Sequence, residues 1–143
     1  MKDEKKLNSK IIRKLITINN NSGFSKLLGC KITDLSYGYA KSKLKIDGKH
    51  LNWLKSVHGG VIWSLADHTS GAVGSTISYA SGNNGAVALQ TSFHFLARVK
   101  PGQTIISEAR LISETSKTII VEMKVSLENG KIVGLGTVTG IKI

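Results

Sequence analysis

The N-terminal part of the chain has the hydrophobic spacing of an amphipathic helix. Apolar residues recur three or four positions apart, a spacing that places side chains on one face of a helix. These residues are Leu7, Ile11, Ile12, Leu15 and Ile16. The run N-N-N-S-G at residues 19–23 is rich in residues that favour turns. We therefore predict an N-terminal helical segment within residues 1–22.

Strict alternation of polar and apolar residues predicts strands elsewhere. Ser42, Leu44 and Ile46 alternate with three lysines, as expected for a first strand with one face in water. A second alternating run covers residues 87–99, and Pro101 and Gly102 follow it as a turn. Two further strands are predicted at 105–112 and 118–127. Asn129 and Gly130 then form a strong hairpin signal that leads into a last strand at 132–141.

Between the first and second of these strands lies a predicted helix over residues 59–77, and its two faces differ. At about 100° per residue, one continuous arc is suited to packing. This arc contains Val61, Ile62, Leu65, Thr69, Ala72, Val73 and Thr76. Asp67 falls on the opposite side, where its neighbours are the small residues Gly60, Ser64, Gly71, Gly74 and Ser78. A carboxylate facing small residues leaves room for a water molecule and a ligand.

The start of the same helix offers a second chemical feature. The first amides of a helix have no intrahelical partner and carry the positive end of the macrodipole. Here the sequence before the helix is His58-Gly59-Gly60, and glycine permits close approach to the backbone. The N–H groups near Gly59 and Gly60 could therefore stabilise a carbonyl oxygen that gains negative charge.

Composition agrees with a single domain over residues 1–143, a chain of usual length for one hydrophobic core. No apolar run reaches about 18 residues, and the first ten residues lack the apolar stretch of a secretory signal. We therefore expect a cytoplasmic protein with no membrane span. The single Cys30 excludes an internal disulfide. Because the four histidines and this cysteine lack ligand spacing, no metal site is expected.

The formal net charge of +11 is concentrated near the N-terminus. Residues 1–49 contain twelve Lys and Arg against four Asp and Glu, whereas the other 94 residues contain eight against five. A basic protein attracts polyanions and anionic small molecules at long range. Nucleic acid is an unlikely partner, because the chain has no Arg-rich run and no alternation of basic and aromatic residues.

The segment from Asn52 to Asp67 resembles the hotdog-fold acyl-CoA thioesterases, specifically the PaaI-like branch of the phenylacetate pathway. In that branch an Asn or Gln is followed after six residues by His-Gly-Gly, and an Asp or Glu lies nine residues after the His. Asn52, His58, Gly59 and Asp67 match every spacing. Residues 24–29, 93–101 and 128–131 resemble the entry turn, a strand end and the last hairpin of the family.

The resemblance implies an α+β hotdog fold, in which an antiparallel β-sheet wraps around a long central α-helix. It also implies a homodimer, possible pairing of dimers into a tetramer, and an active site at the dimer interface. The ligand implied is acyl-CoA, with no cofactor besides the coenzyme A of the substrate. Family members contact the nucleotide phosphates of coenzyme A with basic residues, and the residues at the corresponding places here are Arg98, Lys100 and Lys117. The resemblance also implies that Gly60 contacts the substrate.

The resemblance also assigns roles to the motif residues. The Gly59 N–H would polarise the thioester carbonyl, and Asp67 would act either as general base toward water or as a nucleophile that forms an anhydride. Asn52 would bond the substrate carbonyl or the water. His58 would hold the loop through its ring nitrogens. The acyl group that the enzyme takes is left open by the sequence.

Two departures from the family pattern concern an auxiliary hydroxyl near the acid. Some members place Ser or Thr one helical turn after the acid, but here that residue is Gly71; Ser70 is adjacent and rotated. Others take a Ser from the following strand, at a position aligned with Ala88. Three function classes therefore stay open: an acyl-CoA thioesterase, a non-catalytic hotdog protein that binds acyl-CoA or regulates a partner, and a nucleic-acid-associated protein.

Overall fold

The computed structural model describes residues 7–143 and contains one six-stranded antiparallel sheet with helices on one side. The elements in chain order are α1 (Ser9–Asn20), α2 (Gly23–Leu28), β1 (Lys31–Ser36), β2 (Tyr39–Lys45), α3 (Gly59–Ser81), β3 (Ala86–Phe95), β4 (Thr104–Glu114), β5 (Thr118–Leu127) and β6 (Ile132–Lys142). A short 3₁₀ helix, η2 (Gly48–His50), follows β2. The strand order is β1-β2-β4-β5-β6-β3, so β1 and β3 are the two edge strands.

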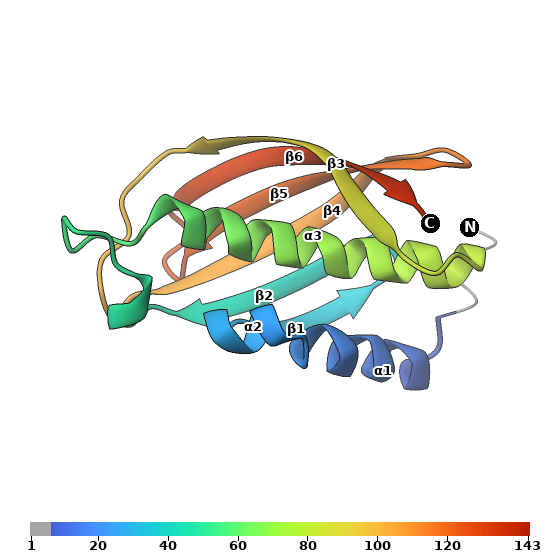
Figure 1. Ribbon diagram of the computed structural model, residues 1–143, viewed down its shortest axis with the longest axis horizontal. Helices are drawn as coiled ribbons and strands as arrows, with labels where there is room; N and C mark the ends of the chain where they lie inside the picture. Colours follow the sequence, from blue (N-terminus) through green and yellow to red (C-terminus); the bar gives the residue numbers. More distant parts are fainter. Residues whose placement is uncertain (1–6) are drawn as a thin grey trace.

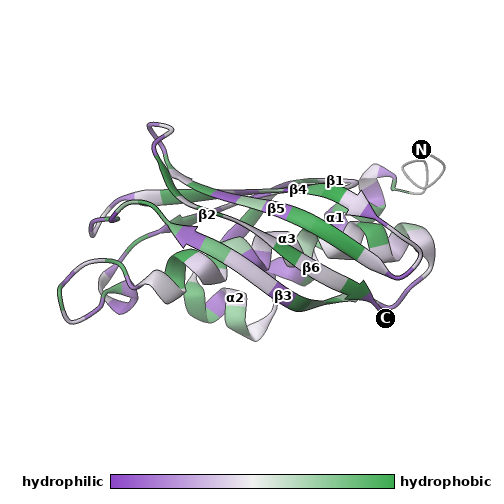
Figure 2. Cartoon of the chain, turned by 90° about the horizontal axis from the view of Figure 1, so that it is seen from above, coloured by the Kyte–Doolittle hydropathy of each residue, from purple (hydrophilic) through white to green (hydrophobic). Residues whose placement is uncertain are grey.

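The long helix α3 lies across the middle of the sheet, which curves around it (Figure 1). Seen from above, α2 and α3 lie on the same side of the sheet (Figure 2). This is the hotdog arrangement that the sequence predicts. The face of α3 predicted to pack is buried at every position except Val61, which is half-buried. The core residues Leu65, Ala72, Val73 and Ile77 are 0% exposed.

Two buried hydroxyl contacts hold α3 to the strands beneath it. Thr69 donates through Oγ1 to the carbonyl of Leu65 at 2.6 Å, and its Oγ1 lies 2.6 Å from Ser42 Oγ on β2. With the Thr69 proton used in the helix, Ser42 is the donor to Thr69. One turn before the helix ends, Thr76 Oγ1 accepts the N–H of Gly38 from the β1–β2 turn. These bonds fix the rotation of α3 about its own axis.

The prediction of one strand before α3 was incomplete, because the structure has two. The predicted strand is β2, where Ser42 and Leu44 are buried and Lys43 and Lys45 are exposed. The missed strand is β1, which carries a bulge between Ile32 and Asp34. A bulge adds one residue to one strand of a pair. The buried residues of β1 therefore stand three positions apart, which hides the period-two pattern.

Several predicted boundaries differ from the observed ones. The central helix continues past residue 77 and ends at Gly82, whose φ of 75° gives a left-handed cap. The strand predicted over 87–99 ends at Phe95, and a register shift between Ala88 and Gln90 interrupts its alternation. The predicted N-terminal helix forms as α1, with residues 1–6 of that segment outside the described part of the chain. The short helix α2, which follows α1, was not predicted.

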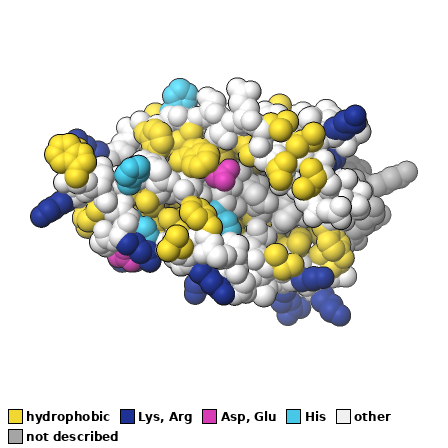
Figure 3. Space-filling model, in the orientation of Figure 1, with side chains coloured by type: hydrophobic (Ala, Val, Ile, Leu, Met, Phe, Trp, Pro, Cys, Tyr) yellow, Lys and Arg dark blue, Asp and Glu magenta, His cyan; other side chains and the backbone are white. Residues whose placement is uncertain are grey.

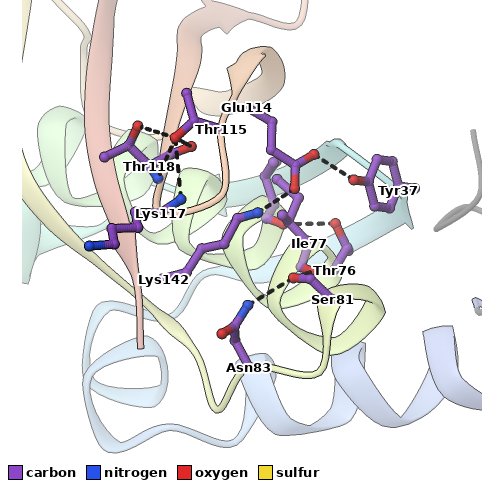
Figure 4. A network of polar contacts seen from close by, with 11 residues as sticks. Tyr37, Thr76, Ile77, Ser81, Asn83, Glu114, Thr115, Lys117, Thr118 and Lys142 are labelled. Carbon is purple, nitrogen blue, oxygen red and sulfur yellow. Dashed lines mark hydrogen bonds and ion pairs between the residues drawn. The ribbon is translucent and has the colours of Figure 1, made fainter.

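One end of the sheet is held by a polar network (Figure 4). Lys142 at the end of β6 pairs with Glu114 at the end of β4, and Tyr37 in the β1–β2 turn donates to the same carboxylate at 2.6 Å. Thr115 and Thr118 close the β4–β5 turn through their hydroxyls, 2.8 Å apart. Two turns and the end of β6, all distant in sequence, thus meet here.

The pairing of β3 with β6 depends on glycine at two positions of β6. A Cβ added to Gly136 would lie 2.1 Å from the carbonyl oxygen of Ser92, and one added to Gly134 would lie 2.5 Å from the ring of Phe93. Real Cβ atoms do not approach other heavy atoms so closely. The absence of side chains here therefore lets Phe93 lie across β6, where it packs against the core.

We expect Gly136→Ala to destabilise the protein by about 1–3 kcal/mol, the usual cost of overpacking, because the Ser92 backbone cannot move without disturbing the β3–β6 ladder. Urea unfolding would measure the change. Gly23→Ala is the matched control, since a Cβ at Gly23 meets nothing within 4 Å and Ala favours a helix. Equal stability of the two variants would contradict this account of the ladder.

Candidate active site

Asp67 stands half-buried on α3, on the side opposite the packed face. It lines a cavity of about 140 Å³ between α3 and the three strands β3, β5 and β6. The other lining residues are Ser70, Gly71, Gly74, Ala86, Val87, Ala88, Ile119, Val121, Val138 and Gly140. The helix approaches β3 closely here, since a Cβ on Gly74 would lie 3.1 Å from Cβ of Ala86.

The carboxylate of Asp67 is poorly compensated. Within residues 7–143 no group donates a hydrogen bond to it, and no cation pairs with it. Burial raises the pKa of Asp67 above its usual value of 3.8, because transfer from water penalises the charged form. In the view of Figure 3, an acidic side chain lies near the middle of the helix-bearing face with hydrophobic groups on both sides, and Lys and Arg lie around the rim, along the lower edge as well as at the ends.

The loop before α3 is built around Asn52 and His58. Asn52 Oδ1 accepts the N–H groups of Leu54 at 3.0 Å and Ser56 at 3.1 Å, so its Nδ2 is the end that stays available as a donor. Lys55 has a φ of 56°, a conformation uncommon outside glycine. The loop ends at His58, the N-cap of α3, whose Nδ1 accepts the Gly60 N–H at 2.8 Å.

The His58 cap bonds one of the two glycine N–H groups and leaves the other without a partner. Because the Gly60 N–H is bonded to the His58 ring, it is not available to a ligand without loss of the cap. The Gly59 N–H donates no hydrogen bond to any residue in the described part of the chain, and Gly59 lines a second cavity. Of the two glycine amides, that of Gly59 is therefore the one that is free to bind a ligand.

The second cavity, of about 360 Å³, brings together three of the predicted residues: Asn52, Gly59 and Arg98. Its remaining walls are mostly apolar and come from the loop, the start of α3 and residues 95–99 that follow β3. They are Leu54, Ser56, Val57, Ile62, Phe95, Leu96, Ala97 and Val99.

Asp67 is not in this second cavity. It lies eight residues after Gly59 on one continuous helix, and a rise of 1.5 Å per residue separates them by roughly 12 Å along the axis. Within one chain the carboxylate and the free amide therefore belong to two different cavities.

Lys100 and Lys117 line neither cavity. Lys100 comes directly after Val99, which lines the second cavity. Lys117 lies in the β4–β5 turn at the other end of the sheet, where its backbone N–H donates to Thr115. Figure 4 shows the Lys117 side chain directed away from the Glu114–Lys142 pair. In a single chain Arg98 and Lys117 are thus near opposite ends of β3.

Sequence reasoning missed most of the cavity wall around Asp67. Gly71 and Gly74 were predicted to face the acid, and they do line the cavity. Ser70 was set aside as rotated away, yet its side chain lines the same cavity and its Oγ donates to the backbone carbonyl of Asp67 at 2.8 Å. The helical angle of 60° between the two residues could have indicated this, since both flank one groove.

Comparison with known proteins places the chain in a family. The Thioesterase superfamily matches residues 54–133, a span that contains the loop from Leu54 onward, α3, β3, β4 and β5 and stops at the start of β6. The chain belongs to the Thioesterase superfamily. Acyl-coenzyme A thioesterase PaaI of Escherichia coli is 28% identical over 131 residues, which cover 84% of this chain and 89% of that protein.

Solved structures of relatives have the same fold. The PaaI protein from the E. coli phenylacetic acid degradation operon superposes with a TM-score of 0.80 at 24% identity, covering 89% of this chain and 88% of that one. The smu.793 protein of Streptococcus mutans, solved bound to acetyl CoA, gives a TM-score of 0.73 at 25% identity, covering 80% and 88%.

Other chemistries find less support in the geometry. No cluster of three His, Cys, Asp or Glu residues within 7–143 could hold a metal ion. His68, next to Asp67, has its pKa lowered by burial, and its Nε2 is buried without a hydrogen-bond partner in the described chain.

Within residues 7–143, none of the helices is both long and apolar enough to cross a membrane.

We expect Asp67→Asn to raise the thermal stability at pH 7 by roughly 1–3 °C, a shift that less than 1 kcal/mol produces in a domain of this size. The folded-state pKa of Asp67 is raised, so its contribution to stability is fully present below pH 3.8 and is lost as the pH rises through the folded-state pKa. The gain from Asn should therefore be small near pH 4 and grow with pH.

Melting curves of both proteins between pH 4 and pH 8 would measure this difference. Asp34→Asn serves as the control, because Asp34 is exposed on β1. A gain for Asp67→Asn that stays constant over this range would show that burial of the charge is not its cause.

Proposed function

We propose that this protein hydrolyses the thioester of an acyl-CoA to a free acid and coenzyme A. The observation that carries the proposal is the Asp67 carboxylate, which lines an apolar cavity with no hydrogen-bond donor or cation to neutralise it. A general base works best when its pKa is raised toward the working pH. The likeness to acyl-coenzyme A thioesterase PaaI supports the same activity.

The cavity around Gly59 supplies the groups that would polarise the carbonyl. The Gly59 N–H stands free at the positive end of α3, and Asn52 Nδ2 is left as a donor because its Oδ1 is bonded within the loop. Two donors aimed at the thioester oxygen would stabilise the negative charge that develops there. His58 supports this arrangement by capping α3 through Gly60.

The two cavities would form one site when two copies of the chain associate. β3 is an edge strand whose Val87, Leu89 and Phe95 are 46%, 62% and 55% exposed, and an unpaired apolar edge favours pairing with another strand. A second copy that pairs antiparallel along β3 would place the Ala86 end of one strand beside the Phe95 end of the other. The Asp67 cavity of one subunit would then meet the Gly59 cavity of its partner.

The same association would bring the basic residues together. Arg98 and Lys100 of one subunit and Lys117 of the other would lie near the same end of the paired strands, where they could bind the phosphates of coenzyme A. The S. mutans relative bound to acetyl CoA supports this class of ligand. We further propose a cytoplasmic homodimer that can pair into a tetramer and needs no cofactor besides the coenzyme A of its substrate.

The reaction uses one water molecule. Its oxygen forms a bond to the carbonyl carbon, the C–S bond breaks, and the proton taken by Asp67 passes to the coenzyme A thiolate. In the alternative route Asp67 attacks the carbonyl first, the C–S bond breaks and coenzyme A leaves as the thiolate. Water then cleaves the resulting anhydride, which releases the acid and regenerates the Asp67 carboxylate, and a proton from the water passes to the thiolate. Gly59 and Asn52 would stabilise the oxyanion in both routes.

A second candidate function is a non-catalytic hotdog protein that binds acyl-CoA. The observation in its favour is Ala88, which lines the Asp67 cavity without the hydroxyl that some relatives carry there. Turnover distinguishes the two functions, because a binding protein would retain acyl-CoA without releasing free coenzyme A.

We expect Asp67→Asn to lower kcat on acyl-CoA by roughly 10²–10⁴-fold, the usual contribution of a positioned acid or base. Gly59→Pro should lower kcat by about 10²–10³-fold, because proline is tolerated at the first helical position but has no N–H. Gly59→Ala is its control, because it keeps the donor. The Cβ that it adds would lie 3.3 Å from the ring of Phe95, a 55% exposed side chain that can shift, so its rate should stay well above that of Gly59→Pro. Release of free thiol from a panel of short, long and aromatic acyl-CoAs measures these rates.

We also expect inactive variants to complement one another. When Asp67→Asn and Gly59→Pro subunits are mixed and allowed to exchange, each mixed dimer has one site with both native groups, so activity should return toward one quarter of wild type. If both groups acted from the same chain, no mixed dimer would contain an intact site. Activity that does not rise after exchange, when mass spectrometry shows mixed dimers, would exclude the shared site.

A further inference from the structure

Ser70 is a buried hydroxyl beside Asp67 that the proposed reaction has not yet used. It is 6% exposed and lines the same cavity as the carboxylate. The strand wall of the cavity offers no side-chain hydroxyl, because it is lined by Ala86, Val87, Ala88, Ile119, Val121, Val138 and Gly140. Ser70 is therefore the side-chain hydroxyl that this cavity contains.

The hydrogen bonding of Ser70 determines what it can offer a ligand. Its proton is donated to the backbone carbonyl of Asp67 at 2.8 Å, so the hydroxyl cannot easily serve as a donor. No group within residues 7–143 donates to its oxygen. A hydroxyl has one proton and two acceptor lone pairs. Ser70 lines the cavity, so its oxygen can accept a hydrogen bond from a ligand there, while its own proton is held by the helix backbone.

A water molecule that attacks a carbonyl carbon needs two acceptors. Its two O–H groups must point away from the carbonyl so that an oxygen lone pair points toward it. Asp67 accepts one of these hydrogens and takes it during the reaction. The second hydrogen needs an acceptor on the same side of the cavity, and Ser70 follows Asp67 by less than one helical turn.

We propose that Ser70 is a positioning residue that accepts the second hydrogen of the attacking water. The inference rests on the proposed function. It applies to the route in which Asp67 acts as general base, because in the anhydride route Asp67 is itself acylated when the water attacks. Ser70 itself neither gains nor loses a proton during the reaction.

Ser70→Ala should lower kcat for hydrolysis by about 10–100-fold with little change in KM, because the water is lost from alignment while the acyl-CoA contacts remain. Ser70→Thr should restore most of the rate, since threonine can make the same bond to a helix carbonyl. Ser78→Ala is the matched control. Ser78 is also buried on α3, but its Oγ has no hydrogen-bond partner in the described chain, and the residue does not line the cavity.

Competition between water and methanol tests the positioning role directly. Methanol has a single O–H, which goes to Asp67, and therefore has no use for a second acceptor. With methanol present, the ratio of methyl ester to free acid should rise several-fold in Ser70→Ala relative to wild type. Ser70→Thr and Ser78→Ala should keep the wild-type ratio, which mass spectrometry of the products would measure.

The outcomes separate this inference from the proposed function. Full activity in Ser70→Ala, or a lower rate with an unchanged product ratio, would overturn the positioning role while Asp67→Asn remained inactive. If the wild type released no coenzyme A from any acyl-CoA tested, both the proposed function and this inference would be wrong. A raised ester ratio confined to Ser70→Ala would establish the inference.

Discussion

The packing of α3 against the curved sheet determines where every candidate group lies. Leu65, Val73 and Ile77 are fully buried beneath the helix, and the Thr69–Ser42 contact fixes its rotation. Once that face is committed to the core, the opposite stripe with Asp67 must open toward β3. The same packing directs the N-terminus of α3 at the loop of Asn52. The site is thus a consequence of helix docking rather than of a separate structural element.

This docking imposes an electrostatic cost at the point where the chemistry is proposed. Asp67 is withdrawn from water without a compensating donor, whereas other charged groups near the sheet ends are paired, as with Glu114 and Lys142. An unpaired half-buried carboxylate lowers stability and at the same time becomes a stronger base. The fold therefore retains the Asp67 carboxylate, which lowers stability locally and is reactive for the same reason.

The sequence predicted the architecture well because its signals were local. The alternation in β2, the Asn129–Gly130 hairpin and the two faces of α3 each arise from residues close together in the chain. β1 was missed because its bulge breaks the period of two. The division of the motif into two cavities could not be predicted either, since spacing along a sequence does not show that Gly59 and Asp67 face opposite ends of β3. Ser70 was overlooked because a helical wheel gives the direction of each side chain around the helix axis. It does not show that the groove beside α3 is wide enough for Asp67 and Ser70 to line it together.

The position of Ser70 has a consequence for how such a cavity can diversify. Carboxylate and hydroxyl come from the same turn of α3 and are held by the same backbone, while the walls opposite come from β3, β5 and β6. Substitutions at Ala86, Ala88 or Val138 could reshape the space for the acyl group without moving either polar group. In this chain the polar groups of the proposed reaction and the walls that would select the acyl group therefore lie on separate secondary-structure elements. Substitutions in the strands can change selectivity without removing the reactive groups of the helix.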